Sequence, residues 1–300
     1  MEERVKRFAP VVMILILFAT QALAEFPEKH RQLVDQVIEL EGSNKMFDAF
    51  PAFFDAIFGT KMLTSRNSEE QAKVLRVVKA AIDIELAKKT YRDYLNSHAV
   101  DDSLGAVLAW VEAPLGKRLS MAESIGANPT ADDKADMVKY LTQLQSSPPS
   151  QERIKLIQKL VDVNNADEFF SEATQDLVKA IAKGIEDGLG CKDADVEAIV
   201  NDFQKERNSL KEASRQQAIL GYFYMYRSFT EQEIEQYIRF MTTKSYRKFE
   251  EANNTAMKAG LEVVARNIGR AVGEKGSMID HQRCTEKETA MPTSGNSGLR

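Results

Sequence analysis

Apolar residues recur along this chain at the spacing of a helix face. Leu104, Val107, Leu108 and Val111 lie at positions i, i+3, i+4 and i+7 of one segment, which is the pattern of an amphipathic helix. Similar segments follow one another from Glu28 onward, and few stretches are rich in the Val, Ile and Thr that favour strands. Proline (8 residues) and glycine (15 residues) are too scarce to interrupt helices often. The pattern predicts an all-α protein.

The helical pattern occurs twice. The segment that begins at Leu104 is matched at an offset of 130 by Ile234, Tyr237, Ile238 and Met241. The same offset pairs Tyr94 with Tyr224, Trp110 with Phe240, Lys117 with Arg247, and Arg118 with Lys248. An earlier block repeats at an offset of 123, which pairs Leu33 with Leu156, Val37 with Leu160, and His30 with Arg153. A unit this long exceeds a solenoid repeat, so the pattern indicates domain duplication.

We therefore expect two tandem helical bundles formed by duplication of one helical unit, the first over residues 25–147 and the second over residues 148–273. Between them, the run Gln145-Ser146-Ser147-Pro148-Pro149-Ser150 contains paired prolines, which cannot continue a helix. Residues 274–300 are polar and rich in Gly, Ser, Thr and Lys, and their composition predicts a disordered tail.

Local signals predict where several helices start and stop. Thr130 with Asp133, and Thr230 with Glu233, have the spacing of capping boxes. Gly42 is placed to end a helix that begins near Glu28. We expect one long helix over about residues 68–97 and its counterpart over about residues 195–227.

The first 24 residues have the order of a secretory signal. A basic start with Arg4, Lys6 and Arg7 precedes an uncharged run over residues 8–24. The run ends in Ala22-Leu23-Ala24, the small-x-small pattern of a signal-peptidase site. The alternative is an uncleaved membrane anchor, for which the run is short, since a spanning helix needs ~20 apolar residues. We expect export with cleavage after Ala24, and no transmembrane segment once the signal is removed.

The overall charge bears on the partners. The chain has 40 basic and 45 acidic residues, a net charge of −5. Binding to nucleic acid depends on basic groups that neutralise phosphates. The composition therefore predicts that nucleic acid is not a partner.

Both copies resemble a described family signature. The second copy contains Phe229-Thr230-Glu231-Gln232-Glu233-Ile234 and later Lys244-Ser245-Tyr246-Arg247-Lys248-Phe249. The first contains Leu104 through Trp110 and then Ala113-Pro114-Leu115-Gly116-Lys117-Arg118. These runs are similar to a bacterial family named only as domain of unknown function 2059, which would be present here as two tandem copies. The resemblance implies a helical fold, a signal peptide and the periplasm, and it brings no known activity.

The candidate binding residues are aromatic and basic. Tyr222-Phe223-Tyr224-Met225-Tyr226 is apolar on all sides of a helix, which indicates either burial between neighbours or a groove for an apolar ligand. Groove candidates are Tyr222 and Tyr226, together with Lys117, Arg118, Arg247 and Lys248 near two helix starts, where cations gain nothing from the helix dipole. A solvated face explains the same cations. Trp110 is expected to fill the core, because Phe240 occupies the paired position.

No catalytic constellation is found in the sequence. The motifs H-E-x-x-H, C-x-x-C and G-x-S-x-G are absent. His98 with Asp101 and Asp102 has metal-ligand chemistry, but a histidine at a helix end that contacts local carbonyls is the better explanation. The prediction is therefore no catalytic residue, no metal and no cofactor.

Cys191 and Cys284 are the only cysteines. An even number in an oxidising compartment is compatible with a disulfide, which in the chain-entropy model would contribute about 4–5 kcal/mol. Two unpaired thiols are the other interpretation, and the sequence leaves both open.

These observations predict a non-catalytic binding or protein-interaction module of the bacterial periplasm, whose partner is a protein or a small apolar ligand. The alternative is a cell-envelope enzyme with a site of carboxylate, Tyr and Arg side chains. A cleft with several carboxylates of shifted pKa would favour the enzyme. An exposed apolar groove without ionisable groups would favour binding.

Overall fold

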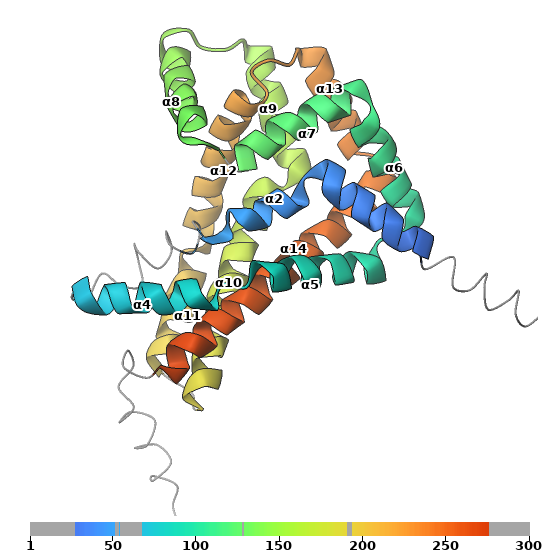
Figure 1. Cartoon of the computed structure of the whole chain (residues 1–300). Helices are drawn as coiled ribbons and strands as arrows, with labels where there is room; N and C mark the ends of the chain where they lie inside the picture. The colour runs from blue at the N-terminus through green and yellow to red at the C-terminus, as the bar shows by residue number, and fades with distance from the viewer. Residues whose placement is uncertain (1–27, 52–53, 55–67, 128, 191–193, 276–300) are drawn as a thin grey trace, which may run out of the picture.

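The computed structural model describes residues 28–51, 54, 68–127, 129–190 and 194–275. Within these ranges all regular secondary structure is helical, so the all-α prediction is confirmed. The first helix covers residues 28–41. It is followed by α2 (Ser43–Asp48), α4 (Ser68–Ala81), α5 (Ile84–His98), α6 (Asp101–Glu112), α7 (Pro114–Ala127), α8 (Ala131–Ser146), α9 (Gln151–Asn164), α10 (Ala166–Leu189), α11 (Ala194–Lys205), α12 (Arg207–Met225), α13 (Glu231–Met241) and α14 (Lys244–Glu274) (Figure 1). None of these described helices is long and apolar enough to cross a membrane.

The predicted helix ends are confirmed where local chemistry determines them. Thr130 caps α8 and Thr230 caps α13 as full capping boxes, each hydroxyl accepting from a backbone N–H at 3.2 Å. Gly42 ends the first helix with a φ of +83°, a left-handed conformation that glycine adopts without strain. These devices satisfy backbone groups that a helix leaves unpaired at its ends.

The two predicted long helices are each broken, so this expectation was wrong. The first is divided into α4 and α5 at Ile82 and Asp83. Asp83 is extended, and its carboxylate accepts from the Leu86 N–H at 2.9 Å, which starts α5. The second is divided into α11 and α12 at Glu206, and α12 ends at Met225. A short acidic side chain competes with the helix for a backbone N–H, and apolar spacing does not reveal that competition.

Helices α10 and α14 form the central pair of the fold and pack along much of their length (Figure 1). Glycines on both helices let the backbones approach closely. A Cβ at Gly184 would lie 2.2 Å from the Arg266 carbonyl oxygen, and a Cβ at Gly269 would lie 2.1 Å from that of Ile181. No side chain fits there. Helices α4, α5 and α6 pack against α14, which therefore contacts elements from both predicted repeats.

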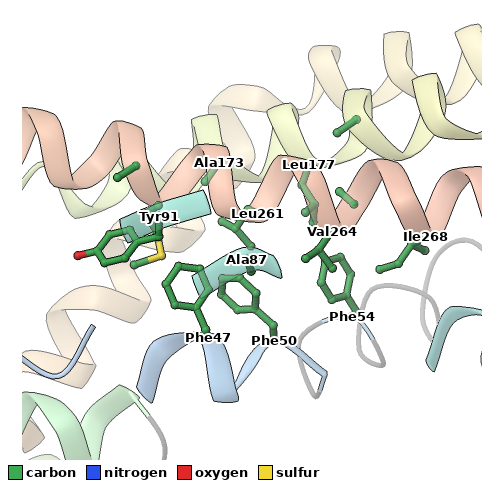
Figure 2. Packing of buried hydrophobic residues seen from close by; sticks show 14 of the residues in the cluster. Phe47, Phe50, Phe54, Ala87, Tyr91, Ala173, Leu177, Leu261, Val264 and Ile268 are labelled. Atoms are coloured by element: carbon green, nitrogen blue, oxygen red, sulfur yellow. The ribbon is translucent and has the colours of Figure 1, made fainter. Parts of the chain in front are cut away.

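The larger hydrophobic core lies along α14. Figure 2 shows the rings of Phe47, Phe50 and Phe54 directed towards α14, where Leu261, Val264 and Ile268 lie. All of these side chains are buried. Emptying such positions costs a few kcal/mol each, so the segment containing α2 is held to α14 by ring packing.

A second core lies where α7, α9, α12 and α13 meet, and includes Leu119, Ile157, Phe223 and Ile234. Both cores contain residues from 25–147 and from 148–273. Within the described residues the two predicted repeats therefore share their cores, and their origin by duplication stays a prediction.

Trp110 and Phe240, which the offset pairs, contact each other. Their rings stack with centroids 4.3 Å apart and an angle of 5° between planes. Both residues are half-buried, not fully buried as the sequence predicted. The contact joins α6 to α13 and lies between the two cores, against both of which these rings pack.

Candidate functional site: a buried carboxyl–tyrosine cluster

The two tyrosines proposed from sequence lie in packed surroundings. Tyr226, directly after α12, is 2% exposed and contacts the rings of Phe229 and Tyr237. Tyr222 is half-buried, and its hydroxyl accepts a hydrogen bond from the Asn164 amide. Both rings belong to the second core, so the burial interpretation of this aromatic run describes them better than an open groove.

The four basic candidates do not converge on one site. Arg118 pairs with Glu233, and its guanidinium lies 4.7 Å from the centre of the Phe229 ring. Arg247 donates to Glu250 at 2.6 Å, one turn further along α14. Lys117 and Lys248 are exposed. These cations stabilise local structure or face solvent.

The histidine next to the acidic residues behaves as a helix-end residue. His98 Nδ1 lies 3.0 Å from the Tyr94 carbonyl oxygen, and its ring stacks on that of Tyr94. Among the described residues no group of three or more His, Cys, Asp or Glu side chains is arranged to hold a metal ion. Cys191 and Cys284 lie outside the described residues, so their pairing stays a prediction.

The structure brings together two carboxyls that sequence reasoning missed. Glu41 is the last residue of the helix over residues 28–41, and Glu123 lies on α7. Both line a cavity of about 20 Å³. The rest of its lining is mainly aromatic and apolar: Val107, Trp110, Val111, Leu119, Ser120, Tyr237, Phe240 and Tyr246. We call Glu41 and Glu123 the acidic pair.

Hydroxyl groups donate to both members of the acidic pair, but unequally. Glu123 accepts from Tyr226 at 2.6 Å and from Tyr237 at 2.8 Å, both to the same carboxylate oxygen. Glu41 accepts from Ser43 at 2.9 Å, its one side-chain donor among the residues that the structure describes. Hydrogen bonds to a carboxylate favour its charged form, and Glu123 therefore has the better-stabilised charge.

Burial opposes the charge on both carboxyls. It raises the pKa of Glu41 from 4.5 to about 7, with a further rise from the nearby charge of Glu123 and a partial offset from Ser43. Burial also raises the pKa of Glu123, against the hydrogen bonds from Tyr226 and Tyr237. The pKa values of the surrounding tyrosines 226, 237 and 246 are raised as well, first by burial and then by these carboxyls. The cluster favours neutral forms.

A third acid lies nearby on α14. Glu250 is 9% exposed, and one of its oxygens has no hydrogen-bond partner within the described structure. Burial raises its pKa, and the salt bridge to Arg247 opposes the rise. The charge of Glu250 also raises the pKa of Tyr246, which links it electrostatically to the acidic pair.

The positions that the sequence offsets pair with Glu41 and Glu123 are amides. The offset of 123 pairs Glu41 with Asn164, and the offset of 130 pairs Glu123 with Asn253. We call Asn164 and Asn253 the amide pair. Asn164 donates to the Tyr222 hydroxyl, and Asn253 accepts from the Tyr91 hydroxyl at 2.5 Å. All four positions therefore serve as hydrogen-bond partners of polar groups near the cores.

The chemistry available to the cavity is limited by its volume. About 20 Å³ is enough for one water molecule, whereas small-molecule sites usually enclose about 300–1,000 Å³. The cluster can bind and exchange a proton, but a substrate does not fit beside it. The sequence did contain a signal for the acidic pair. Glu41 lies one helical turn after the buried Ile38, and Glu123 one turn after the buried Leu119. Charged residues are rare on such helix faces.

Comparison with known proteins adds no relative. No protein family, curated protein or solved structure matches the chain. The functional interpretation therefore depends on the residues described above.

Proposed function

We propose that this protein is an exported, non-catalytic interaction protein of the bacterial periplasm, with a binding surface around α7, α8 and the C-terminal part of α12. The observation that carries the proposal is that α8, a helix of 16 residues, has no buried residue. Export is supported by the signal-like pattern of residues 1–24, and the periplasm by the resemblance to the domain of unknown function 2059.

Large apolar side chains are exposed around α8. Val138 on α8 is 65% exposed and Met121 on α7 is 68% exposed, and Ile125 and Leu220 are exposed nearby on α7 and α12. Both α7 and α8 pack against α12, and α8 lies at the periphery of the fold, at the upper left of Figure 1. Exposed apolar surface next to polar side chains is typical of a protein-interaction surface.

The attachment of α8 combines polar contacts with the half-buried Tyr140 and Leu144, which pack against the second core, and it leaves Val138 accessible. The Tyr224 hydroxyl donates to Asp136 at 3.0 Å, and Arg227 pairs with Asp136 at 3.1 Å. The Tyr140 ring meets the Tyr224 ring edge-on, with centroids 5.9 Å apart. Exposed ion pairs contribute about 0–1 kcal/mol, and no residue of α8 is fully buried, so α8 is held more weakly than the helices that form the two cores.

We also propose that the helical body arose by duplication. Support comes from residues that the offsets pair and that occupy similar places. His30 Nδ1 lies 2.5 Å from Asp101, the first residue of α6, and Arg153 donates to the carbonyl of Phe229 at 2.7 Å, just before α13. Trp110 and Phe240 provide a second correspondence, because both are half-buried and both pack against the two cores.

The proposal is tested by capture from the periplasm with crosslinking. We expect one or a few proteins to be captured by the wild-type chain and lost with Met121→Glu and Val138→Glu. Phe170→Glu is the matched control, because Phe170 is a similarly exposed apolar residue (51%) on α10, away from this surface. Capture that all three variants retain, or that none retains, would exclude this surface.

Export has a separate test. Intact mass spectrometry of the periplasmic protein should give a chain that begins at Glu25. A periplasmic species that retains Met1 would show that residues 1–24 act as an anchor instead.

A second function is favoured by one observation, the acidic pair with raised pKa values. Carboxyls of this kind are common in catalytic sites, and a cell-envelope enzyme would use them as acid and base. The cavity volume argues against this role in the described conformation. A hydrolytic activity of the purified chain that is abolished by Glu123→Gln, with the fold retained, would establish the enzyme.

A further inference from the structure

The acidic pair is half-buried, lines the cavity and has no counter-charge. Among the described residues, neither carboxyl makes a salt bridge, and no basic side chain is part of the environment that shifts their pKa values. Two cations on the neighbouring helices bond to other groups: Lys45 donates to Ser124 at 3.0 Å, and Arg247 donates to Glu250 at 2.6 Å. A buried, unpaired charge is costly, and such groups usually become neutral.

The groups that face the pair are themselves acids. Tyr91 on α5 and Tyr246 on α14 feel the charge of Glu41, and Tyr222, Tyr226 and Tyr237 feel that of Glu123. Glu250 adds a further negative charge from α14. Because these titratable neighbours add no positive charge, a proton is the simplest ligand that removes the repulsion between the two carboxyls.

The hydrogen bonds identify which carboxyl holds the proton. Glu123 accepts from two tyrosine hydroxyls, whereas Glu41 has one serine donor. A carboxylate with more donors keeps its charge better. Glu123 is therefore the charged member and Glu41 the protonated one.

The amide pair indicates that hydrogen bonding alone does not require acids here. Asn164 and Asn253 meet tyrosine hydroxyls as neutral side chains. An amide in place of Glu123 could accept from a tyrosine without any desolvated charge. Unlike these amides, the carboxyls of Glu41 and Glu123 can gain and lose a proton.

We propose that the cavity binds one exchangeable proton between Glu41 and Glu123, and that this proton couples the packing of residues 28–51 against α7 to pH. The coupling has a definite place, because Glu41 ends the first helix and α2 follows it immediately, in contact with α5 and α7. Loss of the proton puts two like charges on the two sides of this contact.

The sign of the pH dependence follows from the direction of the shift. The pKa of Glu41 is higher in the folded protein, about 7, than the ordinary value of 4.5. The folded form then binds the proton more tightly than the unfolded chain, and unfolding releases it. This contribution to stability is fully present below about pH 4.5 and is lost as the pH rises through about 7.

The test is thermal unfolding of the full chain at several pH values. For the wild type we expect the midpoint to fall by about 5 °C between about pH 5.5 and about pH 8. Glu41→Gln should lose at least half of this dependence and exceed the wild type in stability at the higher pH. Glu39→Gln, an exposed acid on the same helix, should keep the wild-type dependence. A flat wild-type profile, or an unchanged slope in Glu41→Gln, would overturn the proposal.

Two measurements on the wild-type chain test the proposal even if Glu41→Gln does not fold. Calorimetric unfolding of the wild type at about pH 6, between the folded and unfolded pKa values of Glu41, in buffers of different ionisation enthalpy, should show release of about one proton; no release, or uptake, contradicts the proposal. Replacing sodium with potassium or ammonium at constant ionic strength should leave the midpoint unchanged. A midpoint that depends on the cation would assign the cavity to a monovalent cation and overturn the assignment to a proton.

Discussion

The acidic pair and the amide pair are two solutions to the same local problem. In both pairs, a polar side chain near the end or on the face of a helix forms a hydrogen bond with a tyrosine hydroxyl. Glu123 accepts from Tyr226 and Tyr237, and Asn253 accepts from Tyr91. The amides achieve this without charge, whereas the carboxyls bring a charge that burial opposes.

The choice between an amide and a carboxyl decides whether the free energy of unfolding depends on pH at that position. A neutral hydrogen bond contributes about 0.5–1.5 kcal/mol at any pH. A carboxylate accepts a stronger hydrogen bond, but the cost of removing its charge from water offsets that gain. Protonation of the carboxylate changes both the gain and the cost. The hydrogen bonds of the amide pair should therefore depend on pH less than those of the acidic pair, because the charges of Glu41 and Glu123 act on Tyr91 and Tyr222 only through space.

The largest effect should come from removing the contact between the two cores. Trp110→Ala should destabilise by about 3 kcal/mol, at the lower end for an aromatic truncation because the ring is only half-buried. Trp110→Phe should cost less than about 1 kcal/mol, since a ring can still stack on Phe240. Urea unfolding of both variants measures this. A wild-type midpoint for Trp110→Ala would show that the stack does not hold the two cores together.

A charge introduced into the amide pair should give it the behaviour of the acidic pair. Asn253→Asp should destabilise by about 2 kcal/mol at about pH 8 and by much less near pH 5, because a desolvated carboxylate replaces a neutral acceptor. Asn201→Asp, at an exposed position on α11, is the matched control and should have little effect. Urea unfolding at both pH values tests this. If Asn253→Asp destabilises the protein equally at the two pH values, charge is not what distinguishes the acidic pair from the amide pair.

The smallest effects should come from removing one tyrosine hydroxyl next to each pair. Tyr226→Phe should cost about 1.5 kcal/mol at alkaline pH, because Glu123 loses a donor and its pKa rises further. The cost should shrink as the pH falls and Glu123 becomes protonated. Tyr91→Phe should cost about 1 kcal/mol with a weaker pH dependence, because its partner Asn253 is neutral and the charge of Glu41 acts on Tyr91 only through space. Parallel pH profiles of the two variants would contradict the comparison.

Local signals in the sequence predicted the helical class, the capping boxes at Thr130 and Thr230, and the helix end at Gly42. Each depends on groups a few residues apart, which the sequence displays directly. The breaks at Asp83 and Glu206 were missed because the apolar spacing continues across them. The stacking of Trp110 on Phe240 was also missed, since an offset between two residues contains no information about their contact.

The proximity of the two carboxyls of the acidic pair could not be predicted from the sequence. Glu41 and Glu123 could be recognised as acids on apolar helix faces, but not as neighbours. Their proximity depends on how the first helix, α7, α13 and α14 pack together around one cavity.

The sequence by itself determined which residues form helices, where several of those helices end and which faces are apolar, because these properties follow from interactions within one turn. The tertiary structure alone decided which polar groups lose water and which charges meet. Desolvation depends on every element that covers a side chain, so the pKa of Glu41 is a property of the assembled fold.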